Sequence, residues 1–279
     1  MNELLSPLSQ FKIEEPASGY WRVTYSNPPI NLLNSTTIVE LGEIVRRIET
    51  APDLRVVVFA SDNPNFFMAR YDLSDPNPVA FTPTASGVSQ FIDATLKLEA
   101  AGPITIAALR GRARGGGSEF ALGCDLRFAS LENTLLGQPE VGVGIVPAGG
   151  GLERLARLVG VPRALEIIAS SDDYDAPTAE RYGWINRAIP DQELDAFVDA
   201  FARRLAGFNV EALAAAKRLT HRHTAAALDD YRETLTELRT LIASPATAAR
   251  RTVLVRHAGA VGADFELRMG RHLGLAGVE

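Results

Sequence analysis

The segment RGRARGGGSEFALGCD, residues 110–125, places Glu119 two residues after three consecutive glycines, Gly115 to Gly117. The apolar run ITIAAL precedes it, which predicts a strand that ends near the glycines and a helix that begins after them. Glycine lets other groups approach the backbone closely, and a helix start leaves N–H groups free to bind a phosphate or an oxygen that gains negative charge. A plain turn is the alternative. The phosphate-loop motif G-x-x-x-x-G-K-[ST] is absent from the sequence.

A second carboxylate, Glu140, lies in the segment LGQPEVGVGIVPAGGG, after a proline at the end of an apparent strand. Two carboxylates at strand-to-loop junctions could reach one cleft from opposite sides. They could then divide the roles of acid and base, if their surroundings separate their pKa values. Glu119 also has a simpler explanation, because an acidic residue in the first turn of a helix is favoured electrostatically.

The stretches GRARGGGSEFALGCDLRFAS and LGQPEVGVGIVPAGGGLERL together resemble the enoyl-CoA hydratase/isomerase (crotonase) superfamily. The resemblance runs from NPPINLLN near residue 28 to AERYGWINRAIP near residue 190, and the C-terminal tail matches only as a helical region. It implies an α/β fold, a crotonase-like spiral of ββα units with a C-terminal helical region. It also implies a homotrimer or homohexamer.

The resemblance implies a site in which the backbone N–H groups of Tyr71 and Gly116 form an oxyanion hole for a thioester oxygen. Glu119 and Glu140 would share a water molecule: one activates its attack at the β carbon and the other supplies a proton at the α carbon. Which glutamate does which stays open. Family position further implies a set of substrate-binding residues, namely Asn31, Leu32, Leu33, Ala69, Arg70, Asp72 and Gly115.

The expected reaction is the addition of water to the double bond of a 2-enoyl-CoA, because family hydratases have glutamates at both positions. Double-bond isomerisation is the first alternative, since it needs only one base. A non-catalytic binding protein with the same fold is the second. We expect an acyl-CoA substrate and no metal or redox cofactor, with coenzyme A as part of the substrate.

Two arginines depart from the family pattern. Arg70 stands where glycine is usual, and it could contact a CoA phosphate or a substrate carboxylate, or be a solvated surface residue. Arg114 replaces a residue that is usually apolar, and it could reach the ligand or face solvent. Asp72 could cap a following helix. Asp125 is expected to stabilise a buried turn.

Alternating strands and helices up to about residue 190 predict an α/β fold with parallel pairing. The segment FKIEEPASGYWRVTY predicts an opening hairpin, and LRVVVFA, PITIAAL and NTLLGQPEV predict later strands. Apolar residues at helical spacing predict two helices in the first hundred residues. They are Ile38, Leu41, Val45 and Ile48 in the first helix, and Val88, Phe91, Ile92 and Thr95 in the second.

From about residue 191 the pattern is helical throughout. We therefore divide the chain into an acyl-CoA-binding core, residues 1–195, and a helical region, residues 196–279, that serves as a lid, an oligomer interface or both. All four histidines, His221, His223, His257 and His272, fall in this region with no acid–base partner visible in the sequence.

The 279 residues carry a net charge of −6, which argues against binding to nucleic acid or to an acidic membrane surface. A local basic pocket that includes Arg110, Arg112 and Arg114 is still compatible with that charge. The single cysteine, Cys124, excludes an intrachain disulfide and is expected in the core. We see no signal peptide and no apolar segment long enough to span a bilayer, so we expect a cytoplasmic protein.

Overall fold

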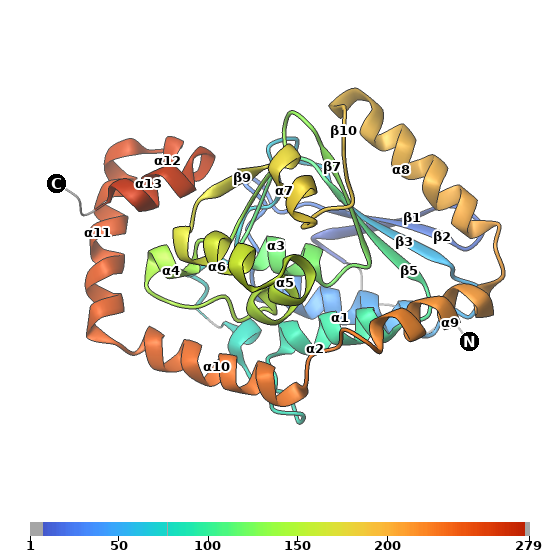
Figure 1. The fold of residues 1–279 in the computed structure, drawn as a ribbon, viewed down its shortest axis with the longest axis horizontal. Helices are drawn as coiled ribbons and strands as arrows, with labels where there is room; N and C mark the ends of the chain where they lie inside the picture. Colours follow the sequence, from blue (N-terminus) through green and yellow to red (C-terminus); the bar gives the residue numbers. More distant parts are fainter. Residues whose placement is uncertain (1–7, 77, 277–279) are drawn as a thin grey trace.

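The computed structural model of the chain describes residues 8–76 and 78–276. Within these ranges the larger sheet has six strands in the order β1-β2-β3-β5-β7-β10 (Figure 1). The strands are β1 (Phe11–Ala17), β2 (Tyr20–Tyr25), β3 (Val56–Ser61), β5 (Ile104–Leu109), β7 (Leu126–Ser130) and β10 (Arg187–Ile189). β1 and β2 form the predicted hairpin, and all other neighbours pair parallel.

The smaller sheet has the order β4-β6-β8-β9. Its strands are β4 (Phe66–Met68), β6 (Arg112–Arg114), β8 (Leu135–Gly137) and β9 (Asp173–Asp175). The chain alternates between the sheets, because β3, β5 and β7 of the larger sheet are followed directly by β4, β6 and β8 of the smaller one. A helix follows each of these strand pairs, and the repeat is therefore the predicted ββα unit.

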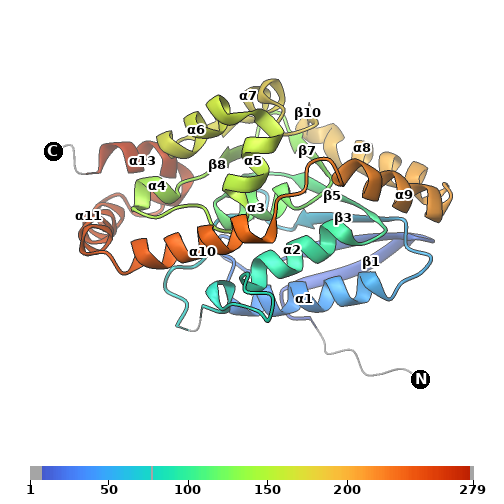
Figure 2. The same ribbon diagram turned by 60° about the horizontal axis from the view of Figure 1, so that its bottom comes forward.

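The helices of the first 190 residues cover the sheets. They are α1 (Ser35–Glu49), the 3₁₀ helix η1 (Val79–Phe81), α2 (Gln90–Ala100), α3 (Gly116–Leu122), α4 (Glu140–Val143), α5 (Gly151–Val159), α6 (Val161–Ser170) and α7 (Ala176–Tyr182). α1 begins at a capping box in which Asn34 and Thr37 bond reciprocally. α1 and α2 lie side by side against one face of the larger sheet (Figure 2). The predicted stripe of α1 is buried there, whereas Val88 precedes α2.

Strand β3 shows why the larger sheet is buried on both faces. Its side chains alternate, so Val57 and Phe59 join the main core with α1 and α2, while Val56 and Val58 face the other way. That second face is covered by α8 (Asp191–Ala206), which packs Leu194, Val198 and Ala202 there. A strand with two apolar faces is typical of a parallel sheet between helical layers.

The C-terminal region is helical, as predicted, and it wraps around the core. After α8 come α9 (Val210–His221), α10 (Leu228–Ile242), α11 (Pro245–Val261), α12 (Asp264–Leu267) and α13 (Met269–Leu275). Figure 1 shows α11, α12 and α13 at the end of the molecule away from α8. The expected boundary between residues 195 and 196 falls inside α8, and the division into two regions stays a prediction.

Among the described residues, no helix combines the length and the apolar character needed to cross a membrane. The expectation of no signal peptide concerns the N-terminal segment of the chain. Residues 1–7 of that segment lie outside the described residues.

Candidate active site

Each of the three glycines at the start of α3 makes room for a different group. A Cβ on Gly115, which has a φ of +49°, would collide with Oε1 of Glu140. A Cβ on Gly116 would lie 2.9 Å from Leu33 Cδ1, and one on Gly117 would collide with the carbonyl oxygen of Met68. The glycine run thus lets a carboxylate, a pocket wall and strand β4 all approach the same turn.

Glu119 lies in the first turn of α3, as predicted, and it is 4% exposed. Its Oε1 accepts hydrogen bonds from the N–H groups of Gly149, at 2.7 Å, and Gly151, at 3.0 Å. Burial raises the pKa of Glu119 to about 7, against the lowering effect of these two hydrogen bonds. At neutral pH the group can therefore both take up and release a proton.

Glu140 is the first residue of the short helix α4, directly after Pro139. Its Oε2 is buried and has no hydrogen-bond partner in the described part of the chain. Burial, followed by repulsion from Glu119, raises the pKa of Glu140 well above its ordinary value. The raised pKa and the unpartnered Oε2 both favour the protonated form of this carboxyl group.

The two expected oxyanion donors are neighbours in space. A Cβ on Gly116 would lie 3.7 Å from Tyr71 N. Gly116 is the first residue of α3, so its N–H has no partner within the helix. Leu33 forms a bridge with Tyr71 in which Leu33 N–H bonds to Arg70 O, and Asp72 N–H bonds to Leu33 O. These bonds hold the Arg70–Tyr71 peptide and use other groups than the N–H of Tyr71.

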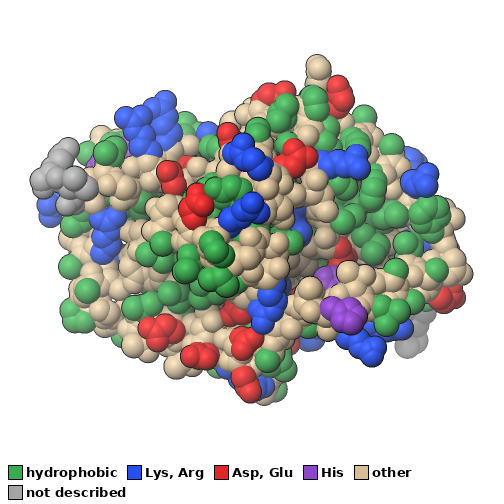
Figure 3. Space-filling model, viewed as in Figure 1, with side chains coloured by type: hydrophobic (Ala, Val, Ile, Leu, Met, Phe, Trp, Pro, Cys, Tyr) green, Lys and Arg blue, Asp and Glu red, His purple; other side chains and the backbone are tan. Residues whose placement is uncertain are grey.

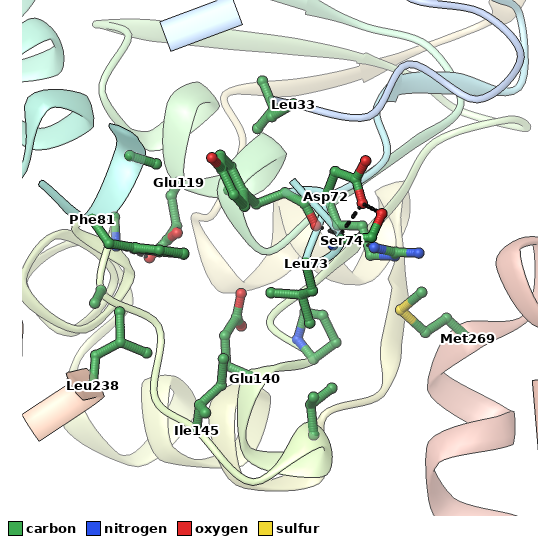
Figure 4. A pocket seen from close by; sticks show the side chains of 18 of the residues that line it. Leu33, Asp72, Leu73, Ser74, Phe81, Glu119, Glu140, Ile145, Leu238 and Met269 are labelled. Atoms are coloured by element: carbon green, nitrogen blue, oxygen red, sulfur yellow. Dashed lines mark hydrogen bonds between the residues drawn. The ribbon is translucent and has the colours of Figure 1, made fainter. Parts of the chain in front are cut away.

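A cavity of about 420 Å³ joins these groups. Gly116, Tyr71, Glu119 and Glu140 all line it, and most of the remaining lining is apolar. In Figure 4 the carboxylates of Glu119 and Glu140 point into the same space from α3 and α4. The tail supplies part of the wall through Leu238, Leu254, Phe265, Met269 and Leu273, so the C-terminal helices close over the site.

The structure brings some of the expected substrate-binding residues to this cavity. Leu33, Arg70 and Asp72 line it, while Asn31, Leu32, Ala69 and Gly115 are not among its lining residues. Asn31 is fully buried with a φ of 53°, and its side-chain amide donates to Ser61 Oγ at 2.8 Å. Asn31 therefore shapes the loop before α1. The binding roles of all seven residues stay predictions.

Asp72 caps no helix. Its Oδ1 accepts hydrogen bonds from the N–H of Ser74, at 2.9 Å, and from the hydroxyl of Ser74, at 2.6 Å. The next helical element is η1, which begins only at Val79. Asp72 thus stabilises a turn at the mouth of the cavity, and its neighbour Ser74 also lines it (Figure 4).

The arginines before the glycines form no open basic pocket. Arg114 is only 1% exposed and makes a two-pronged ion pair with Asp173 on β9, at 2.6 and 2.7 Å. Both expectations for Arg114, ligand contact and solvent exposure, are therefore wrong. Arg110 pairs with Asp191 and Asp195 of α8.

One charged cluster was missed because its members are far apart in the sequence. Asp125, expected at a buried turn, accepts hydrogen bonds from Thr105 on β5 and pairs with Lys217 and His221 of α9. His221 also pairs with Glu99, at 3.0 Å, and these two carboxylates raise its pKa to about 9. The cluster attaches α9 to the core.

Cys124 is buried, as expected, and burial raises the pKa of its thiol to about 12. Within the described ranges, no group of three or more histidine, cysteine or acidic side chains is arranged to hold a metal ion.

The chain matches the family model described as enoyl-CoA hydratase/isomerase over residues 15–254. It is 36% identical to the short-chain-enoyl-CoA hydratase of Clostridium acetobutylicum over 62% of this chain and 66% of that protein. It is 35% identical to the crotonyl-CoA hydratase of Syntrophomonas wolfei over 66% of this chain and 71% of that protein. A crystal structure from Streptomyces avermitilis covers 96% of this chain and 98% of its own, at a TM-score of 0.89 and 37% identity.

Proposed function

The chain belongs to the enoyl-CoA hydratase/isomerase family and has its crotonase-like fold, and from this premise we propose that it is an enzyme that adds water to a 2-enoyl-CoA thioester. The proposal rests on one observation. Two glutamates with raised pKa values, the buried Glu119 and the half-buried Glu140, face one cavity beside the N–H of Gly116 at the start of α3. Relatives named as hydratases support the same reaction.

Glu119 acts as the general base in this proposal. Two backbone N–H groups bond to its Oε1, and they stabilise the carboxylate form, so this is the more easily ionised of the two glutamates. Its carboxylate takes a proton from a water molecule, and the water oxygen forms a bond to the β carbon of the enoyl group.

Glu140 acts as the general acid. Its unpartnered Oε2 and its raised pKa favour the protonated form, and this proton goes to the α carbon, where the electron pair of the double bond arrives. One cycle leaves a proton on Glu119 and a charge on Glu140, and exchange with water restores both groups.

The N–H groups of Gly116 and Tyr71 would stabilise the thioester oxygen while it carries enolate-like charge. Such donors act most strongly on the charge that develops in the transition state, and loss of one costs about 3–4 kcal/mol. The apolar walls, with Phe81, Ile145 and Leu238 among them (Figure 4), suit the hydrocarbon part of an acyl group. Coenzyme A is thus part of the substrate, and the chain's own groups perform the chemistry without a metal or redox cofactor.

The test follows the conjugated enoyl-thioester absorbance of crotonyl-CoA and longer 2-enoyl-CoAs. The wild-type chain should remove it, while Glu119→Gln and Glu140→Gln should each be slower by a factor of about 10² or more. Glu237→Gln, on the exposed side of α10, is the matched control and should be as active as wild type. Binding of CoA esters without turnover would support a binding protein instead, and a shifted double bond without added water would support an isomerase.

Assembly into a homotrimer or homohexamer is part of the proposal. Leu158, Val161 and Leu165 of α5 and α6 are exposed, and Figure 3 shows hydrophobic side chains gathered over α6. Such a patch on a surface of mixed charge is typical of a contact between subunits. Light scattering after size-exclusion chromatography should give three or six chains, and Leu165→Glu should lower that number. The cytoplasmic location also stays a proposal, which cell fractionation would test.

A further inference from the structure

Arg70 sits between the C-terminal helices and the expected oxyanion donor Tyr71. Its Nη1 donates a hydrogen bond to the carbonyl oxygen of Tyr71, at 3.1 Å, and its Nη2 pairs with Oε1 of Glu266 on α12, at 2.6 Å. The side chains of Arg70 and Glu266 are only 25% and 19% exposed. An ion pair shielded to this degree holds its geometry better than one on an open surface.

The same short helix is held from a second direction. The carbonyl oxygen of Glu266 accepts from Arg114 Nη1, at 2.6 Å, and that of Leu267 accepts from Arg112 Nε, at 3.1 Å. These are the last carbonyl groups of α12, which a helix leaves without internal partners. The two arginines of β6, Arg112 and Arg114, thus hold the C-terminal helices against the core. The sequence did not predict this role.

The peptide that carries the Tyr71 N–H is therefore fixed from two sides. Its carbonyl oxygen, on Arg70, accepts from the N–H of Leu33 at 2.9 Å. The next carbonyl, on Tyr71, accepts from the Arg70 side chain, which α12 in turn holds. Tyr71, Arg70 and Glu266 all line the cavity, so this connection between α12 and the Tyr71 carbonyl lies at the site itself.

We propose that Arg70 is a positioning residue that, through its ion pair with Glu266, couples the closed C-terminal helices to the orientation of the Tyr71 N–H. This inference rests on the proposed function, because it assigns Arg70 a role in that same site. A glycine at position 70 would leave the tail and the oxyanion donor unconnected. In this chain the second of the two restraints on the donor is present only while α12 covers the cavity.

The test is a double-mutant cycle with Arg70→Ala, Glu266→Ala and the double variant. Each single change should lower kcat for 2-enoyl-CoA hydration about tenfold with KM changed less than about threefold, since a small displacement of a catalytic group reduces rate more than binding. The double variant should be no slower than the slower single one, because both changes break one connection. Arg268→Ala, in the same segment but with a side chain 60% exposed, is the control and should match wild type.

A second readout works without turnover. A chromophoric cinnamoyl-CoA absorbs at longer wavelength when its thioester oxygen accepts hydrogen bonds, because excitation moves charge onto that oxygen. Arg70→Ala and Glu266→Ala should reduce this shift, and Arg268→Ala should keep it. If wild type shows the shift but hydrates nothing, the proposed function fails while the positioning role stands. Unchanged kcat and shift in Arg70→Ala would overturn the positioning role, and so would a raised KM alone, which indicates direct contact with the substrate.

Discussion

Replacing Glu119 with glutamine should change how the stability of the protein depends on pH. The folded-state pKa of Glu119 is about 7, above its ordinary 4.5, because burial disfavours the charged form. Between these two values the folded chain holds a proton that the unfolded chain has released. The wild-type free energy of unfolding therefore falls as pH rises from about 4.5 to about 7 on account of this group, and glutamine removes that part of the fall.

The difference between 4.5 and about 7 corresponds to about 3 kcal/mol, at about 1.4 kcal/mol per pKa unit. Relative to wild type, Glu119→Gln should thus gain about 3 kcal/mol in stability between pH 4 and pH 9. Glutamine keeps an oxygen that can accept from the N–H groups of Gly149 and Gly151, so the packing changes little.

Urea unfolding at several pH values, followed by circular dichroism, measures this difference. The exposed control Glu237→Gln should differ from wild type by an amount that stays constant with pH. A constant difference for Glu119→Gln as well would refute the reasoning, because it would mean that burial does not perturb this carboxyl group.

Three further predictions concern the surroundings of the site. Gly149→Ala should lower kcat by a factor of about 10², because the added Cβ would collide with Oε2 of Glu119. Gly259→Ala is the control, because a Cβ added there would meet no atom within 4 Å. This control variant should be active and more stable than wild type by about 0.5–1 kcal/mol in urea unfolding. Arg114→Ala should lower the free energy of unfolding by about 3–5 kcal/mol, since Asp173 loses its buried partner. Dialysis against EDTA should leave hydration of crotonyl-CoA unchanged, and lost activity restored by a metal would contradict the proposed chemistry.

The sequence predicted the elements that carry the site because their signals are local. The apolar run ITIAAL and the glycines after it marked β5 and α3, and the first-turn position of Glu119 followed from them. The hairpin of β1 and β2 was visible as alternation on both sides of a turn. The match to the family confirms the predicted family and fold.

The arginines could not be placed because their partners are distant in the chain. Arg114 pairs with Asp173 across β8, and Arg70 with Glu266 from a helix nearly two hundred residues later. The same holds for His221 and Asp125, which meet only because α9 packs on β5. A single sequence contains no signal for such pairs, since opposite charges occur everywhere on a chain.

For the glycines, the sequence predicted close contacts to the backbone but not the groups that make them. Their presence indicated close approach, but the approaching groups were unknown: the Glu140 carboxylate at Gly115 and the Met68 carbonyl at Gly117. The raised pKa values of both glutamates likewise depend on burial by α4, α5 and the tail, which only the assembled fold determines.

The most direct test of the account is to incubate the protein with crotonyl-CoA in oxygen-18-labelled water and to examine the product by mass spectrometry. We expect a 3-hydroxyacyl-CoA that carries one labelled oxygen, formed by wild type and by Glu237→Gln and nearly lost in Glu119→Gln and Glu140→Gln. An isomerised or unchanged thioester without label from the wild-type protein would contradict hydration as its reaction.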